Sequence, residues 1–280
     1  MIAGYEDFMK DFEDFFRRAL RRNEDLAKVN YFLYSPEDLI SGLEGKEREV
    51  LLKVAVEGMK TGYDLHSGRG SIISSSTWHY TRSSLVDNGL IELKKEEPFR
   101  TQKRKRKMYG PTFKGLVVAI QGLARDEEKE KVRKVAENWG HMIPSVLDKW
   151  DLFVKEDLED ETFNALCGTA FWFYKINTSD EEKNEEPAFS FARQFYEKIL
   201  DDYLFFSPSP LSLYLPKDIS LKYRNEIEQK RKESREKWLE CFLKDTKIKE
   251  LVKNLLEEKE SQFKNDLEEI QSFNTKITSL

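Results

Sequence analysis

Apolar residues recur at intervals of three and four along most of this 280-residue chain, which is the spacing of amphipathic helices. Helices are expected over residues 5–20, 50–57, 61–66, 74–88, 116–123, 132–150 with a kink at Pro144, 163–173, 189–203 and 217–270. Two stretches differ, because Leu90 to Lys94 alternates between apolar and polar residues and Lys107 to Gly110 can return antiparallel to it. The chain is therefore expected to be mainly α, with one β-hairpin.

The helix expected from Ser74 to Asn88 has two unlike faces. Ser74 or Ser75 can cap its start, and Asn88-Gly89 marks its end. One face carries Trp78, Thr81, Arg82 and Leu85, and the other carries Ser76, His79, Tyr80 and Ser83. Short hydroxyls, an imidazole and a phenol can donate to or accept from base edges and phosphates. Taken alone, the pattern fits a polar surface helix equally well.

Basic residues concentrate around the expected hairpin, although the whole chain has a formal net charge of -5. Residues 60–114 hold twelve Lys and Arg against five Asp and Glu, whereas the rest of the chain holds 35 against 47. Six basic residues are expected at or beside the hairpin tip: Arg100, Lys103, Arg104, Lys105, Arg106 and Lys107. A cationic tip beside a polar helix can lie along phosphates or enter the minor groove, which favours DNA as the partner.

Three motifs carry a resemblance to a known family. Val56 to Leu65 resembles the glycine-punctuated Gly-Tyr-acid-Leu segment of PadR-like winged-helix regulators. Ser76-Thr77-Trp78 leading to Leu85, followed by Asn88-Gly89-Leu90-Ile91, resembles their recognition helix and its exit, a pattern shared with the broader MarR-like group. Thr112 to Gly115 resembles the Thr-x-x-Gly with which these domains leave the wing. The resemblance covers about residues 46–120.

Arg82 departs from this family pattern. Such helices usually present an aliphatic residue to the core at its position. Either Arg82 extends its stem along the core and holds its guanidinium at a phosphate, or the helix is rotated by one residue from the expected phase.

The resemblance implies a winged helix-turn-helix domain, with three helices and a β-hairpin wing, over residues 41–124. An N-terminal amphipathic helix over residues 1–40 would precede it, and an all-helical dimerisation or effector domain over residues 125–280 would follow. The expected recognition-helix contacts are Ser75, Ser76, Thr77, His79, Tyr80, Arg82 and Ser83, and the expected wing contacts are the six basic residues of the hairpin.

The function expected from these features is sequence-specific, homodimeric DNA-binding transcriptional regulation, with double-stranded DNA as the partner. Modulation by a ligand or partner at the helical domain is left open, because the aromatic residues from Phe163 to Phe206 also fit a plain core. The alternative is a winged-helix protein-interaction or scaffold module without specific DNA binding.

Other classes of function find little support in the residue pattern. The three histidines and two cysteines are scattered, so no metal site, cofactor or catalytic set is expected, and the chain is not expected to be an enzyme. The most apolar stretch, 163–174, is shorter than the roughly 20 residues of a membrane-spanning helix. The acidic N-terminus lacks the layout of a signal peptide, and a cytoplasmic protein is expected.

Overall fold

The computed structural model describes residues 42–43, 45–68, 70–98, 105–125, 128–176, 186–201 and 217–278. The chain divides into two compact units, residues 1–191 and 192–280, with the division inside one helix. The expected N-terminal helix and residues 99–104 between the two hairpin strands lie outside the described residues.

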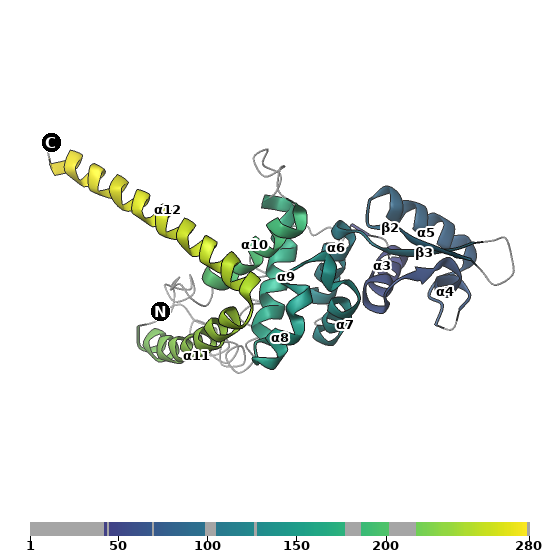
Figure 1. Cartoon of the computed structure of the whole chain (residues 1–280), viewed down its shortest axis with the longest axis horizontal. Helices are drawn as coiled ribbons and strands as arrows, with labels where there is room; N and C mark the ends of the chain where they lie inside the picture. Colours follow the sequence, from purple (N-terminus) through teal and green to yellow (C-terminus); the bar gives the residue numbers. More distant parts are fainter. Residues whose placement is uncertain are drawn as a thin grey trace, which may run out of the picture. The chain divides into compact units, whose positions relative to one another are not determined.

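The first described elements are three helices and a small antiparallel sheet (Figure 1). In chain order they are α3 (Gly45–Glu57), β1 (Lys60–Thr61), α4 (Gly62–His66), α5 (Ser75–Asp87), β2 (Ile91–Pro98) and β3 (Lys105–Pro111). The sheet order is β1-β3-β2, so the returning hairpin strand lies in the middle. The expected hairpin is confirmed, and β1 has no counterpart among the elements expected from the sequence.

The phase expected for the 74–88 helix is confirmed. Trp78, Thr81 and Leu85 are buried in α5, and Arg82 between them is half-buried, so the helix is not rotated by one residue. Ser74 is the N-cap, and its side-chain oxygen accepts a hydrogen bond from the Thr77 backbone N–H at 3.1 Å.

Helix α6 (Phe113–Arg125) is buried along most of its length and packs against α3, α7 and α9. The other described elements of this unit are α7 (Lys129–Trp139), the short 3₁₀ helices η1 (Gly140–Met142) and η2 (Leu147–Lys149), α8 (Trp150–Lys155), α9 (Glu159–Ile176) and α10 (Pro187–Ile199). The last turns of α10 belong to the second unit. Because α7 also packs on α3, the contacts of α3 extend past the boundary expected at residue 124.

The single kinked helix expected over residues 132–150 is wrong. The chain leaves the helix at Trp139 and forms two 3₁₀ turns before α8 begins. Pro144 has no backbone N–H for a helical hydrogen bond, and Ser145 after it has a left-handed φ of 66°. Together they break the helix instead of bending it.

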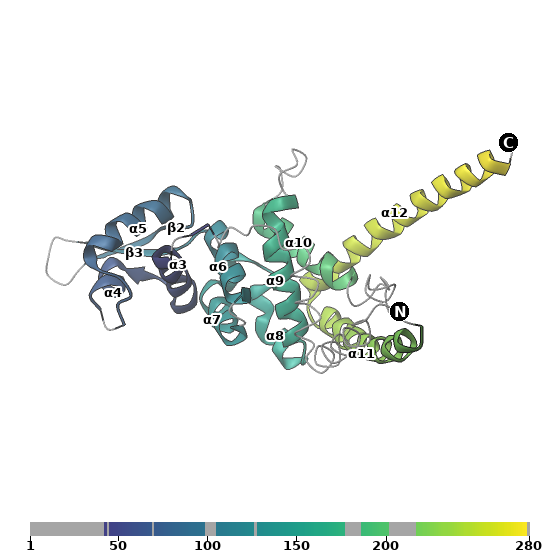
Figure 2. The same ribbon diagram turned by 180° about the vertical axis from the view of Figure 1, so that it is seen from behind.

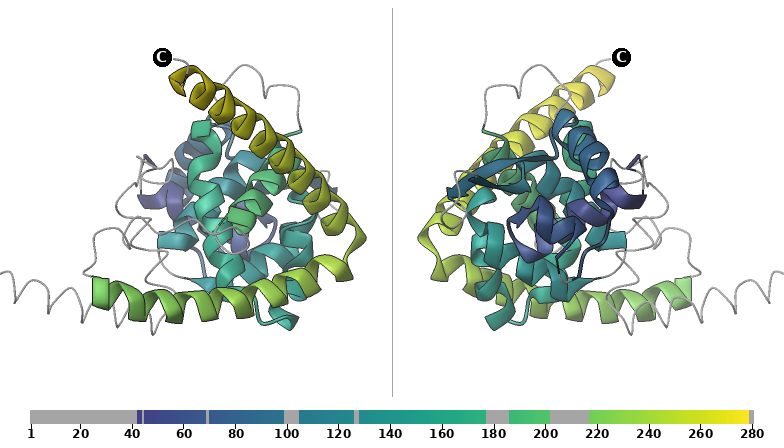
Figure 3. Two further views of the ribbon diagram at one scale, coloured as in Figure 1. Left: turned by 90° about the vertical axis from the view of Figure 1, so that its left-hand side faces the viewer. Right: turned by 90° about the vertical axis from the view of Figure 1, so that its right-hand side faces the viewer.

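The second unit contains α11 (Lys217–Lys244) and α12 (Thr246–Thr278), where the sequence pattern predicted one helix. Asp245 separates them, because its carboxylate accepts from the backbone N–H groups of Lys247 and Ile248 at 2.9 and 3.1 Å and caps α12. Figure 3 shows the change of direction between the two helices. Trp238, Phe242 and Val252 are buried near this corner.

Candidate nucleic-acid interface

The outward face of α5 is polar and open. Ser75, Ser76, His79, Tyr80 and Ser83 are exposed, and the Tyr80 side chain reaches 81% exposure. The other two residues expected on this surface, Thr77 and Arg82, are half-buried. The structure therefore brings the expected residues together on one helix, with five of the seven on its exposed face.

Hydrogen bonds divide these side chains into two groups. The Ser74 hydroxyl pairs with the hydroxyls of Ser76 and Thr77 at 2.9 and 2.7 Å, so both belong to the helix cap. The side chains of His79, Tyr80 and Ser83 make no hydrogen bond within the part of the chain that is described. These three can donate to or accept from another molecule without breaking a bond inside the protein.

An aromatic contact holds α5 on the sheet. The Trp78 and Tyr109 rings meet edge to face, with their centroids 5.5 Å apart and an interplanar angle of 75°. Gly62 lies under the indole, and a Cβ added there would come within 2.5 Å of the Trp78 Nε1 atom. The exposed face of α5 is therefore fixed relative to β3, and Figure 2 shows α5 running along the hairpin.

The Thr-x-x-Gly motif joins the end of the hairpin to the end of α5. The Thr112 hydroxyl donates to the Gly89 carbonyl at 2.5 Å and accepts from the Gly115 N–H at 3.0 Å. A Cβ on Gly115 would lie 1.7 Å from the Leu90 carbonyl oxygen, so only glycine fits. The motif therefore fixes the position of the hairpin relative to the C-terminal end of α5.

Lys105, Arg106 and Lys107 are exposed and belong to β3, not to the loop in which the sequence pattern placed the first two. Arg100, Lys103 and Arg104, the other expected cationic contacts, lie outside the described residues. The two described strands together hold five basic and three acidic residues, a small positive balance.

Alternation along β3 separates these cations between the two faces of the sheet. Lys105, Lys107 and Tyr109 are two residues apart and share a face, and Tyr109 contacts α5. Arg106 shares the other face with Gly110, where an added Cβ would meet the Trp139 ring of α7 at 2.6 Å. Lys105 and Lys107 therefore lie on the α5 side, and Arg106 on the α7 side.

Acidic side chains accompany the cations on each face. Glu96 faces Lys107 across the ladder, and its carboxylate lies 3.4 Å from the Lys105 Nζ and 3.9 Å from the Lys107 Nζ. On the other face, Glu97 stands opposite Arg106 and pairs with Lys95 at 2.6 Å. The hydrogen bond and charge of Lys95, with a smaller effect of Arg106, hold the pKa of Glu97 below its ordinary value.

A capping box at the start of α4 adds a further carboxylate near Arg106. Thr61 donates to the Asp64 carboxylate through its backbone N–H at 2.9 Å, and the Asp64 N–H donates to the Thr61 hydroxyl at 3.2 Å. Burial acts to raise the pKa of Asp64, but the Thr61 hydrogen bonds and the charges of Lys60 and Arg106 outweigh it and lower the pKa.

The hairpin is also attached to α7, which the sequence pattern did not indicate. A bulge at Lys94 turns this side chain over the Trp139 ring, with its Nζ 5.9 Å from the ring centroid. The Trp139 indole donates to the Ala55 carbonyl at 2.9 Å, and Asn138 donates to the Val56 carbonyl at 3.0 Å. The last carbonyls of α3 are thus satisfied by residues more than 80 positions away, a distance at which sequence periodicity carries no signal.

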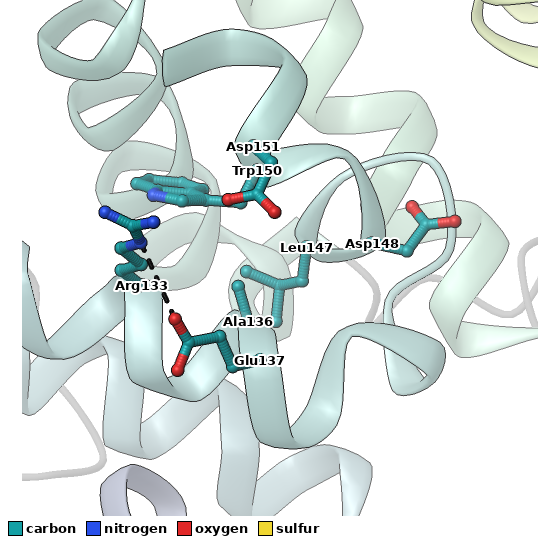
Figure 4. A pocket seen from close by; sticks show the side chains of 7 residues that line it. All are labelled: Arg133, Ala136, Glu137, Leu147, Asp148, Trp150 and Asp151. Carbon is teal, nitrogen blue, oxygen red and sulfur yellow. Dashed lines mark ion pairs between the residues drawn. The ribbon is translucent and has the colours of Figure 1, made fainter. Parts of the chain in front are cut away.

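A polar hollow lies elsewhere in this unit, beside α7 and α8 (Figure 4). It is lined by Arg133, Ala136, Glu137, Leu147, Asp148, Trp150 and Asp151. Three carboxylates against one guanidinium make its lining unsuited to an anion. The buried Trp150 indole N–H has no hydrogen-bond partner among the residues that the structure describes.

Among the residues that the structure describes, no cluster suits metal binding or thiol chemistry. No set of three or more His, Cys, Asp or Glu side chains in the described ranges is placed to hold a metal ion. Cys167 and Cys241 are buried and form no disulfide, and burial raises the pKa of Cys167, which makes it a poor nucleophile. No described helix is long and apolar enough to cross a membrane.

No family model, curated protein or solved structure matches this chain. The residues of α5 and the β2–β3 hairpin are therefore the basis on which a function can be argued.

Proposed function

We propose that residues 45–125 form a winged helix-turn-helix domain and that the protein is a sequence-specific DNA-binding transcriptional regulator. The order of three helices followed by a hairpin, with α5 leading directly into β2, supports this fold. In this proposal α5 is the recognition helix and the β2–β3 hairpin is the wing.

The observation that carries the proposal is that polar and cationic side chains lie on the same side of the domain. The open polar face of α5 and the cations Lys105 and Lys107 lie on one side of the sheet, and the buried Trp78–Tyr109 contact fixes their relation. A duplex needs both kinds of group, because base contacts specify the sequence and phosphate contacts position the protein.

The mechanism follows from groove dimensions. The major groove of B-DNA, about 12 Å wide, admits one helix, and α5 would enter it with His79, Tyr80 and Ser83 towards the base edges. Lys105 and Lys107, with the basic residues between the two strands, would contact the phosphate backbone or the minor groove. The half-buried Arg82 would rest its stem on the domain and direct its guanidinium to a phosphate.

We further propose that the protein acts as a homodimer that reads a palindromic operator. Exposed apolar side chains in the second unit, Leu239 and Leu243 on α11 and Phe263 on α12, are consistent with a subunit contact there. A ligand or partner at the helical part would act by changing the spacing of the two recognition helices. The proposal includes a cytoplasmic location and no enzymatic activity.

The test is selection of genomic duplex fragments by the purified protein, followed by gel-shift titration and footprinting. Tyr80→Ala should weaken binding to a selected site by roughly 1–3 kcal/mol in binding free energy and relax the preferred sequence, because a base contact is lost. Val86→Ala, on the same helix and 41% exposed, is the matched control.

The alternative, a winged-helix module that binds protein, has two observations in its favour. Carboxylates on β2 already neutralise part of the hairpin charge, and Tyr80 is exposed like an interface aromatic. This alternative predicts no duplex affinity at any salt concentration, and the same titration decides between the two.

A further inference from the structure

One carboxylate stands among the cations on the α5 side of the hairpin. Glu96 lies directly opposite Lys107 in the β2–β3 ladder and is within ion-pair distance of both Lys105 and Lys107. Its side chain is 34% exposed, whereas those of the two lysines are 68% and 58% exposed. The carboxylate is therefore the more covered group, and the cations extend past it into solvent.

Stability does not explain this arrangement. Exposed ion pairs usually add little to the free energy of folding, because water and salt screen them and two long side chains must be held still. The Glu96 carboxylate has a larger effect on the binding of a competing anion than on the free energy of folding. A phosphate that approaches Lys105 or Lys107 must replace Glu96 as their partner and is repelled by its charge.

This penalty is independent of DNA sequence. Phosphates are the same at every site, so Glu96 weakens binding to all duplexes, while the contacts made by α5 differ between them. A uniform weakening lowers the affinity for DNA of every sequence, and it leaves the ratio of specific to non-specific affinity to the contacts made by α5.

We propose that Glu96 is an affinity-limiting residue of the DNA-binding surface, which holds Lys105 and Lys107 back from phosphates and so weakens binding to DNA of any sequence. The inference rests on the proposed function. It assigns a role to an acidic residue that lies among basic ones.

The next residue supplies a matched control. Glu97 lies on the same strand and carries the same charge, but it stands opposite Arg106 and pairs with Lys95 on the α7 side. Glu96→Gln and Glu97→Gln therefore change the net charge equally. They differ in which face of the hairpin loses its carboxylate.

The experiment measures the affinity of the full chain and both variants for a mixed-sequence duplex and for a selected genomic fragment, over a series of salt concentrations. Glu96→Gln should tighten mixed-sequence binding roughly three- to tenfold and steepen the salt dependence by about 0.9 log units per log salt for each additional phosphate that the lysines bind. Binding to the selected fragment should tighten by a similar factor, so the ratio of specific to non-specific affinity should stay unchanged. Glu97→Gln should show only the weaker, long-range effect of one charge.

Two results would overturn the inference while leaving the proposed function intact. Equal effects of the two variants would mean that net charge alone matters, and no effect of Glu96→Gln would mean that its carboxylate does not compete with phosphate. If the unmodified protein binds neither duplex at low salt, the proposed function itself is wrong and the inference falls with it. Thermal unfolding of both variants verifies that the fold is unchanged.

Discussion

The indole of Trp78 on α5 meets the phenol ring of Tyr109 on β3 edge to face, at a centroid separation of 5.5 Å. Trp78 is 5% exposed and Tyr109 is 8% exposed, so the contact is part of the core. It joins a helix whose other face is polar to a hairpin whose outer part is cationic. The candidate DNA surface depends on this contact, because neither element makes that surface alone.

Removing the contact should loosen the whole surface. Trp78→Ala is expected to lower the free energy of unfolding by about 3–5 kcal/mol, because a large buried ring leaves a cavity. Amide exchange in β2 and β3 should quicken with it, and chemical denaturation together with hydrogen exchange measures both effects. Val86→Ala on the exposed side of α5 should change the free energy of unfolding by no more than about 0.5 kcal/mol. Unchanged exchange in β3 would show that the hairpin is held by other contacts.

The corner between β3 and α6 should tolerate no side chain at Gly115. Gly115→Ala is expected to lower the free energy of unfolding by about 3 kcal/mol or more, because the new Cβ would lie 1.7 Å from the Leu90 carbonyl oxygen. Gly45→Ala at the start of α3 is the matched control, since nothing lies within 4 Å of its Cβ position. A thermal melt of the two variants compares them directly, and equal melting temperatures would contradict the close contact.

Adjacent cations on β3 should differ in their effect on DNA binding. Lys107→Ala is expected to reduce the salt dependence of duplex binding by about 0.9 log units per log salt, because Lys107 lies on the α5 side and the variant removes its proposed phosphate contact. Arg106→Ala removes the same charge from the α7 side, and its effect should be clearly smaller. A larger effect of Arg106→Ala in the same titrations would place the DNA on the other face of the hairpin.

The Thr61–Asp64 capping box should make stability depend on pH in the acidic range. The pKa of Asp64 is lower in the folded protein than its ordinary value of 3.8, so the unfolded chain binds the proton more readily. The contribution of Asp64 is therefore complete above pH 3.8 and is lost as the pH falls through the folded-state pKa. Asp64→Asn should lower the free energy of unfolding near neutral pH. In strong acid the variant and the unmodified protein should have the same stability at this site. Denaturation curves across this range measure the effect, and a constant difference would indicate a role independent of charge.

Much of the local structure follows from the sequence by itself. The spacing of Trp78, Thr81 and Leu85 determines which face of α5 is buried, and Asn88-Gly89 determines where the helix ends. The sequence limits its start to Ser74 or Ser75, and the structure shows Ser74 as the N-cap. These features depend on neighbours within a few residues, so they can be read along the chain. The break at Asp245 belongs to the same class, because an Asp followed by an apolar helical pattern is an N-cap signal.

Tertiary structure alone decides which carboxylate of β2 shares a side with α5. The Lys94 bulge shifts the β2–β3 register, and it is accommodated by Gly110 and by Trp139. A one-residue change of register moves side chains to the opposite face, so Glu96 and Glu97 exchange roles if the bulge is absent. Residues far apart in the chain control this register, which is why the sequence indicates a basic hairpin and only the fold decides that Glu96, not Glu97, faces Lys105 and Lys107.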